Sequence, residues 1–357
     1  MELWVTREAY PTMTQIKSRR TATKGPTLKD VARQAGCTAS TVSAVLNNSS
    51  AARVISSETK KRVLAAASAL DYEPNFAARS LRLKRTYTIG VITEEIGDPY
   101  GGMVISGIES LLTAKKYFFA AVAHRHNRHL FHQYSKILLS RGVEGLIAID
   151  TSLWESFNVP TVAIAGHRRV RGVTNIIIDH RRAAELALGH LRELGHQHIA
   201  FLRGQSFSSD SSNRWQSIIE AAKKFGIEVQ PELTGEMKDD DPSPRVGYHV
   251  TKQLISRSPR FTALFAYNDI SAIGAIRAIQ ETGARVPADI SVIGFDDIRE
   301  AAYQFPSLTT IRQPLRSMGE IAARTVVNRI EGQQDYPDEI AIEPELIVRE
   351  STCCCRT

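Results

Sequence analysis

The sequence predicts an α/β protein in which an N-terminal three-helix unit is followed by two doubly wound parallel lobes. Apolar residues recur at helical spacing in residues 27–70, and short apolar runs alternate with helical stretches from residue 87 onward. Residues 1–86 contain 15 Lys and Arg against 6 Asp and Glu, a net charge of +9, whereas the rest of the chain contributes −2 to the total of +7. This basic head indicates a polyanionic partner, with a solvated basic tail as the alternative.

The composition argues against several classes of protein. An apolar content of 43% and a charged content of 23% are ordinary for a soluble globular protein. The first twenty residues lack the apolar core of an export signal, and no apolar run approaches the ~18 residues that span a membrane. We therefore expect a cytoplasmic, nucleoid-associated protein without a membrane partner. Residues 1–24 form a basic arm that we expect to be disordered, and Met13 is an alternative start.

Enzyme signatures are absent from the sequence. Neither G-x-S-x-G, a Walker lysine loop nor H-E-x-x-H is present. Among the four cysteines Cys37 is alone, and Cys353, Cys354 and Cys355 are adjacent, which fits a reducing compartment rather than a disulfide framework. We predict no catalytic residues, no cofactor and no metal.

Residues 25–72 have the pattern of three short helices with a tight turn between the first two. Thr27 and Asp30 form a capping-box pattern, Gly36 suits the turn, and Thr38 is a good cap for the second helix. The inward positions at helical spacing are Leu28, Val31, Ala32, Ala35, Val42, Val45, Leu46, Val63, Leu64, Ala67 and Leu70. This spacing matches a helix-turn-helix, whose second helix enters the DNA major groove, and a helical bundle of other purpose is the alternative.

The second helix carries short side chains on its outward positions: Ala39, Ser40, Thr41, Ser43, Ala44, Asn47 and Asn48. Hydroxyl groups can bond phosphates or bases, and alanine can meet a thymine methyl group. None of these side chains is a bidentate reader of guanine. If this helix reads DNA, it does so without arginine.

The next stretch, YEPNFAARSLRLKR, runs from Tyr72 to Arg85 and predicts a hinge over residues 73–86. Pro74 ends the third helix, and Asn75 can cap a short segment that contains Leu81. An exposed leucine beside several cations suits an apolar wedge in the minor groove, with packing of a linker as the alternative.

These residues resemble the lactose repressor/galactose repressor family of bacterial transcription factors. The segments TLKDVARQAG, TVSAVLN, SSETKKRVLAAASALDYEPN and AARSL stand in the family's order, and the resemblance continues to about residue 350. It implies a homodimer on a double-stranded, near-palindromic operator, with a hinge helix that folds on DNA and places Leu81 in the central minor groove. The predicted DNA contacts are Thr27, Thr38, Ala39, Ser40, Thr41, Ser43, Ala44, Asn47, Tyr72, Asn75, Ala78, Arg79, Leu81 and Arg82. The loop over residues 49–55 is about three residues longer than the family's pattern.

Residues 87–350 have the pattern of two parallel sheets covered by helices on both faces. The near-continuous apolar runs are TIGVI, FFAAVA, GLIAI, TVAIAG, NIIID, HIAFL, ALFAY and ISVIGFDD. Ligands of such sheets bind beyond the carboxyl ends of the strands. The resemblance implies a periplasmic-binding-protein-like effector domain, whose chain crosses between lobes near Asp179, residues 308–314 and Asp338.

Four residues just after these strands are the predicted effector contacts: Tyr100, Arg214, Asp269 and Asp297. An arginine and an aspartate beside an aromatic ring suit a polyhydroxylated or zwitterionic ligand, although Asp269 also suits a helix cap. Ala165 and Gly166 replace an aspartate of the family's pattern, which predicts a roomier and less acidic cleft.

Two further clusters carry weaker signals. His124, His126, His129 and His132 suit a metal site, but neighbouring arginines favour a solvated basic surface. Cys353–Cys355 suit metal binding or oxidation, but a disordered tail over residues 351–357 is favoured.

The sequence as a whole predicts a dimeric repressor controlled by a sugar or a related metabolite. A free-standing solute-binding protein and a regulator without an effector response are the alternatives.

Overall fold

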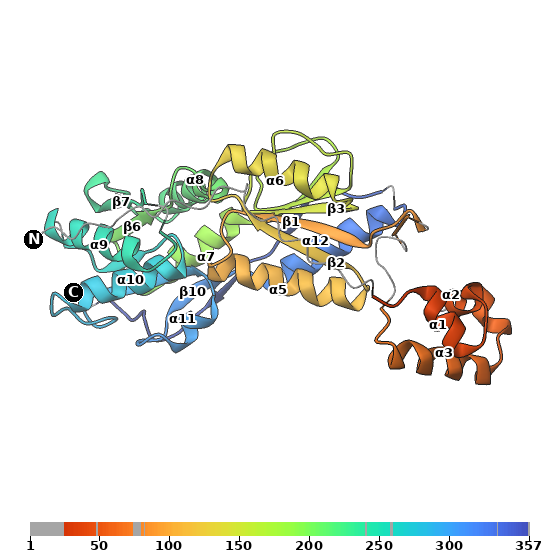
Figure 1. The fold of residues 1–357 in the computed structure, drawn as a ribbon. Helices are drawn as coiled ribbons and strands as arrows, with labels where there is room; N and C mark the ends of the chain where they lie inside the picture. Colours follow the sequence, from red (N-terminus) through yellow and green to blue (C-terminus); the bar gives the residue numbers. More distant parts are fainter. Residues whose placement is uncertain are drawn as a thin grey trace, which may run out of the picture. The chain divides into compact units, whose positions relative to one another are not determined.

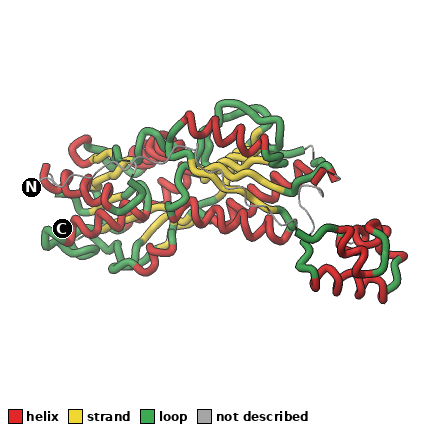
Figure 2. The backbone as a smooth tube through the Cα atoms, viewed as in Figure 1, coloured by secondary structure: helices red, strands yellow, loops and turns green. Residues whose placement is uncertain are grey.

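The structure, a computed structural model, describes residues 25–47, 49–73, 80–81, 83–239, 241–257, 260–333 and 335–355. The predicted basic arm and the predicted DNA contacts Asn75, Ala78, Arg79 and Arg82 lie outside the described residues. The described residues up to Arg85 form one compact unit, and those from Thr86 onward form a second (Figures 1 and 2).

The N-terminal unit contains the three predicted helices. They are α1 (Leu28–Ala35), α2 (Ala39–Leu46) and α3 (Ser57–Ala69). Asp30 accepts hydrogen bonds from the backbone N–H and the hydroxyl group of Thr27, which fixes the start of α1. Gly36 ends α1 in the left-handed conformation at φ 62°, and Thr38 accepts a hydrogen bond from Thr41 N at 3.2 Å. The helix-turn-helix prediction is confirmed.

In α3 the buried residues of this unit differ from the prediction. Val31, Val42 and Val63 are fully buried, but Leu64 is 54% exposed and Ala66 is buried in α3 instead. Residues predicted as an enlarged loop form the 3₁₀ helix η1 (Ser50–Val54), which buries Ala52. The extra residues after α2 therefore add to the core.

The first lobe is built on a six-stranded parallel sheet within the described residues, in the order β11-β5-β4-β3-β1-β2. The strands are β1 (Thr88–Thr93), β2 (Phe118–Ala123), β3 (Gly145–Ile149), β4 (Thr161–Ile164), β5 (Val173–Ile178) and β11 (Glu339–Ile342). Both faces of the sheet are covered, which explains the continuous apolar runs. On β3, Ile147 and Ile149 pack toward α5 (Pro99–Ala114) and α12 (Leu315–Ile330), whereas Leu146 packs toward α6 (Arg128–Ser140) (Figure 1).

The second lobe has a sheet with the order β12-β10-β9-β8-β6-β7, in which β12 alone is antiparallel to its neighbour among the described strands. Its strands are β6 (Ile199–Arg203), β7 (Thr234–Glu236), β8 (Ala263–Phe265), β9 (Ser291–Asp296), β10 (Thr309–Arg312) and β12 (Glu345–Ile347). The helices are α7 (His180–Glu193) and α8 (Ser209–Lys224) on one face, and α9 (Arg245–Arg257) and α10 (Asp269–Gln280) on the other. Two short helices, η2 (Pro231–Leu233) and α11 (Arg299–Tyr303), complete this lobe. None of the helices that the structure describes combines the length and apolar character of a membrane span.

Within the described residues the chain passes between the lobes three times. The first two passages, at Asp179 after β5 and between β10 and α12, lie where the resemblance implied them. The third lies between β11 and β12, at residues 343–344. The expectation of Asp338 is wrong because that residue precedes β11 and its carbonyl accepts a hydrogen bond from Asn175 N in the first lobe.

The C-terminal residues 351–355 are packed against the second lobe, and the expectation of a disordered tail is wrong for them. Val292 N donates a hydrogen bond to Ser351 O at 2.7 Å, and Ser351 is fully buried. Cys353 N donates to Ser291 Oγ, and Cys355 N donates to Leu194 O. Backbone hydrogen bonds hold this segment in place. Its composition did not predict this order, because the segment has no pattern of apolar residues.

Helices α5 and α12 approach closely because glycine stands on both. A Cβ atom on Gly107 would overlap the carbonyl oxygen of Arg316, and one on Gly319 would overlap the carbonyl oxygen of Val104. Two backbones in such contact leave no room for side chains, so this packing requires glycine.

We expect Gly107→Ala to lower the free energy of unfolding by about 1–3 kcal/mol, because the added methyl group forces α5 and α12 apart. Gly102→Ala is the matched control, since Gly102 lies on the same helix with no atom near its missing Cβ. That control should gain up to about 1 kcal/mol from the lost flexibility of glycine. Urea unfolding measures both, and equal effects would show that the helices are not in backbone contact.

Candidate functional site

The predicted DNA-reading helix presents mainly hydroxyl groups. Ser40 is exposed, and Thr41 and Ser43 are half-buried. The hydroxyl groups of Thr38 and Thr41 lie 3.0 Å apart, and Asn47 Nδ2 donates to Ser43 O at 2.7 Å. These groups are available to phosphates and base edges on one side of α2.

Two alanines of this helix are oriented differently from the prediction. Ala44 was expected to face outward, but it is buried, and the chain after α2 turns back so that Ser49 N donates to Ala44 O. Ala39 packs against the helical core. Neither methyl group stands fully outward as a thymine contact requires.

Among the remaining predicted DNA contacts that the structure describes, two are exposed and one is packed against the core. Thr27 is exposed and bonded to Asp30, while Tyr72 packs against the helical core. Leu81 is 82% exposed, as an apolar wedge before DNA binding would be.

In the second unit, the carboxyl ends of strands from both lobes face a cavity of about 120 Å³. Acidic residues of the first lobe, Glu94, Asp98 and Asp150, line one side together with Tyr100 and His126. The second lobe contributes Gln205, Phe207, Ser208, Tyr267 and Asn268. A smaller hollow of about 50 Å³ shares several of these residues and extends to Asp210, Arg214 and Asp296. The expectation of a less acidic cleft is wrong.

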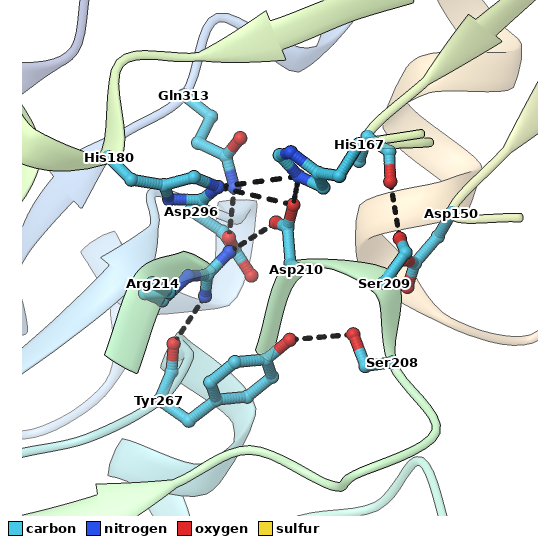
Figure 3. A network of polar contacts seen from close by, with 11 residues as sticks. Asp150, His167, His180, Ser208, Ser209, Asp210, Arg214, Tyr267, Asp296 and Gln313 are labelled. Atoms are coloured by element: carbon cyan, nitrogen blue, oxygen red, sulfur yellow. Dashed lines mark hydrogen bonds and ion pairs between the residues drawn. The ribbon is translucent and has the colours of Figure 1, made fainter. Parts of the chain in front are cut away.

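The amino end of α8 bridges the two lobes. Ser209 Oγ lies 2.6 Å from Asp150 Oδ1 and contacts the carbonyl oxygen of Ala165, both in the first lobe. The next residue, Asp210, contacts His167 Nε2, which follows β4 of the first lobe (Figure 3). Two consecutive residues of one helix therefore hold three groups of the opposite lobe.

Asp210 is also the partner of the buried arginine of this cleft. Arg214 Nη2 lies 2.6 Å from Asp210 Oδ2, and Arg214 Nη1 donates to Tyr267 O at 2.6 Å. The guanidinium group stacks 3.9 Å above the ring centroid of Phe295. Although burial opposes ionisation of Asp210, the neighbouring side chains of His180, His167 and Arg214 hold the pKa of its carboxyl well below the usual value.

The carboxyl groups on the first-lobe side behave differently. Burial raises the pKa of Glu94 to about 8 and raises the pKa of Asp150 well above its usual value. Burial also raises the pKa of Asp98. Glu94 therefore holds a proton near neutral pH and can act as a hydrogen-bond donor as well as an acceptor.

The structure brings together two of the four predicted effector residues. Tyr100 and Arg214 line the cavities, and the Tyr100 hydroxyl group is buried without a hydrogen-bond partner among the described residues. Asp269 is fully buried behind the cleft, where it accepts hydrogen bonds from Thr310 Oγ1 and Ile298 N, and its neighbour Asn268 lines the cavity. Asp297 forms ion pairs with Arg312 and Arg349, away from both cavities.

Sequence reasoning missed the residues on which the bridge depends. They are Asp150, His167, His180, Ser209 and Asp210. One local signal was available, because Asp210 and Arg214 stand at i and i+4 on one helix. The other residues come from separate elements and carry no signal in the sequence.

The histidines that were predicted to form a solvated surface differ in their exposure. His124 is buried and its Nε2 lies 2.9 Å from Thr151 Oγ1, and burial lowers its pKa to about 4. His126 lines the cavity, whereas His129 is exposed on α6. The expectation of a solvated surface is therefore wrong for His124.

Comparisons with known proteins agree with this architecture. A family model described as bacterial regulatory proteins, lacI family, matches residues 27–75, and one described as a periplasmic binding protein-like domain matches residues 188–352. The HTH-type transcriptional repressor PurR of Serratia proteamaculans (strain 568) is 35% identical over 334 residues, which cover 91% of this chain and 96% of that protein.

Two solved structures extend the comparison. The lac repressor dimer bound to operator and the anti-inducer ONPF has a TM-score of 0.82 and 30% identity, and covers 92% of this chain and 100% of its own. A complex of the transcriptional regulator CelR with cellobiose has a TM-score of 0.66 and 28% identity, with coverages of 91% and 99%. The predicted fold class is confirmed.

We expect the raised pKa of Glu94 to make stability fall as pH rises. The folded state keeps a proton up to about pH 8, whereas an unfolded glutamate loses it near its usual value of 4.5. The stabilisation present below pH 4.5 is therefore lost between pH 4.5 and 8, by at most about 5 kcal/mol.

Glu94→Gln should remove this loss, and Glu109→Gln, at an exposed glutamate of α5, is the control. The free energy of unfolding in urea at pH 5 and pH 8.5 measures the difference. If all three proteins share one pH slope, Glu94 is not a buried protonated group.

Proposed function

Because the chain belongs to the lacI family of bacterial regulatory proteins, we propose that it represses transcription as a homodimer on a near-palindromic operator, under control of a small molecule in the cleft. The chain is a DNA-binding transcriptional regulator, and its family consists of regulators rather than enzymes. We assign residues 25–72 to DNA binding, 73–86 to the hinge and 87–350 to effector binding, and place the protein in the cytoplasm on DNA. The observation that carries the proposal is a helix-turn-helix unit joined to a two-lobed cleft that α8 bridges.

The DNA-binding half of the proposal rests on charge and on exposed groups. The net charge of +9 over residues 1–86 supplies attraction to phosphates that does not depend on sequence. Ser40 and Thr41 of α2, and Asn47 immediately after it, are the residues that we assign to base or phosphate contacts. Leu81, which is exposed, is assigned to the central minor groove, where an apolar side chain opens a base step.

The effector half rests on the size and lining of the cavity. A volume of about 120 Å³ equals that of about four water molecules in the liquid, which is the scale of a small metabolite. Tyr100 and Phe207 supply apolar rings, and the buried Tyr100 hydroxyl group has no hydrogen-bond partner among the described residues, so a ligand can supply one. Tyr100, Arg214 and Asn268 are the effector residues that we assign, in place of Asp269 and Asp297.

The electrostatics of the cavity restrict the chemistry of the effector. Among its described lining residues, His126 is the side chain that can carry a positive charge, and its Nδ1 lies 3.1 Å from Glu94 Oε1. The guanidinium group of Arg214 in the adjoining hollow is bonded to Asp210 and Tyr267. The other ionisable side chains that line the cavity are mainly carboxyl groups. We therefore propose an uncharged or cationic effector rich in hydrogen-bond donors, and we exclude phosphorylated ligands.

Control of DNA binding follows from linkage between the lobes and the hinges. A ligand shifts an equilibrium between lobe arrangements only by its difference in affinity for them. The cavity is lined from both lobes, so an effector contacts groups whose spacing changes when the lobes move. That movement would change the separation of the two hinges of the dimer and hence operator affinity.

Leu81→Ala should weaken specific operator binding about 10-fold or more, because burial of a leucine side chain contributes about 1.5–3 kcal/mol. Binding to random duplex, which depends on phosphate contacts, should change less than about 2-fold. Fluorescence anisotropy with an operator selected from a random pool measures both. Val54→Ala, at another exposed apolar residue of the same unit, is the control, and an equal loss on both duplexes would contradict the wedge.

The effector assignment is tested with pairs of compounds that differ by one phosphate group. Thermal-shift screening should find a polyol or an amine that stabilises the protein. Its phosphate ester should bind at least about 10-fold more weakly, because the described lining residues offer no unpaired cation to offset the desolvation of a phosphate group. Tyr100→Phe should reduce affinity for the compound without changing the unfolding temperature of the free protein, since its hydroxyl group has no partner among the described residues. Tighter binding of the phosphate ester would overturn the assignment.

A further inference from the structure

Beside the effector cavity, two imidazoles and a carboxylate converge on one point. The ligand atoms of His167, His180 and Asp210 all lie within 4.8 Å of one another. Among the described residues, this is the one group of three or more His, Cys, Asp or Glu side chains placed so closely. His180 Nε2 lies 3.5 Å from His167 Nε2 and 3.3 Å from Asp210 Oδ1. His167 Nε2 contacts the same carboxylate oxygen, and Figure 3 shows both rings directed at Asp210.

Separate elements hold these three side chains in place. His167 follows β4 in the left-handed conformation, at φ 50°. His180 is the first residue of α7, and Asp210 is the second residue of α8. The side chains are 6–9% exposed, so packing limits their motion. Such fixed and converging donors are what a metal site requires.

We propose that His167 Nε2, His180 Nε2 and Asp210 Oδ1 bind a divalent transition-metal ion, with Zn²⁺ as the best match. Imidazole nitrogen and carboxylate oxygen are common zinc ligands at about 2.0–2.2 Å, and a tetrahedral arrangement at that distance separates its ligand atoms by about 3.3–3.5 Å. The separations of His180 Nε2 from its two neighbours match this spacing. Three protein ligands leave a fourth position for water or another small ligand.

The surrounding charges are compatible with a bound cation. Arg214 occupies the other oxygen of Asp210, so the oxygen that faces the histidines is the one available to an ion. Asp150 and Asp296 also lie in this region, and their carboxyl groups can offset the added charge when ionised. The alternative is a metal-free cluster in which both imidazoles donate hydrogen bonds to Asp210.

Because the proposed site lies between the two lobes, a bound ion would affect the arrangement of the lobes. His167 belongs to the first lobe, whereas His180 and Asp210 begin helices of the second, so one ion would cross-link the lobes. Metal binding would then favour the lobe arrangement in which the three ligands meet, by the same linkage as for an effector.

Titration of the metal-stripped full-length protein with Zn²⁺ tests the proposal directly. Cys353, Cys354 and Cys355 are first replaced by serine, so that thiols close to His196 cannot compete for zinc. Isothermal titration calorimetry should show one ion per chain. His167→Ala and His180→Ala should each weaken binding by 10-fold or more, and His129→Ala, at an exposed histidine, should leave it unchanged.

Cobalt provides a second, spectroscopic readout that reports the coordination of the ion. Co²⁺ bound to the serine-substituted protein should show the visible absorption of a four-coordinate N/O site, and Zn²⁺ should displace it. Folded His167→Asn and His180→Asn, checked by circular dichroism, should lack this spectrum. Failure of the serine-substituted protein to bind either ion, or retention of binding in the histidine variants, would overturn the proposal.

Discussion

The contact between the amino end of α8 and the first lobe is the interaction on which the cleft depends. Ser209 reaches Asp150 and Ala165, and Asp210 reaches His167. The same carboxylate holds Arg214, which in turn donates to the Tyr267 carbonyl. Because Asp210 is buried, it needs these partners to stay ionised, and each partner is held by a different element. The carboxylate of Asp210 therefore links the contact between the lobes to a side chain that lines the cleft, Arg214.

The cleft separates two electrostatic environments within a short distance. On the α8 side, His180, His167 and Arg214 keep Asp210 ionised. On the first-lobe side, burial raises the pKa of Glu94 to about 8 and the pKa of Asp150 well above its usual value. A ligand that enters between them meets hydrogen-bond donors and acceptors but no unpaired cation among the described lining residues. The same arrangement explains why we propose a polyol or an amine as the effector and why acidic metabolites are poor candidates.

Much of the fold and a smaller part of the site could be predicted from sequence. The eight apolar runs correspond to strands of the two sheets. Both faces of each sheet are covered, so nearly every residue of such a strand is apolar, and the strand can be recognised from the sequence alone. β7, β10, β11 and β12 are short, and each contains one charged residue, so they gave no such signal. Tyr100 and Arg214 were found because they follow strands, but Asp269 follows one too and turns behind the sheet. His167 and His180 meet Asp210 only after folding, across two lobes.

Hydrogen exchange in Asp210→Asn is the measurement that tests most directly whether this charge joins the lobes. The substitution keeps the shape of the side chain and removes the charge that His167 and Arg214 face. The account predicts faster exchange of the backbone amides in residues 164–168 and 207–212, with unchanged exchange in the core strands β3 and β9. Unchanged exchange in both junction segments would contradict it, because the lobes would then be held together without Asp210.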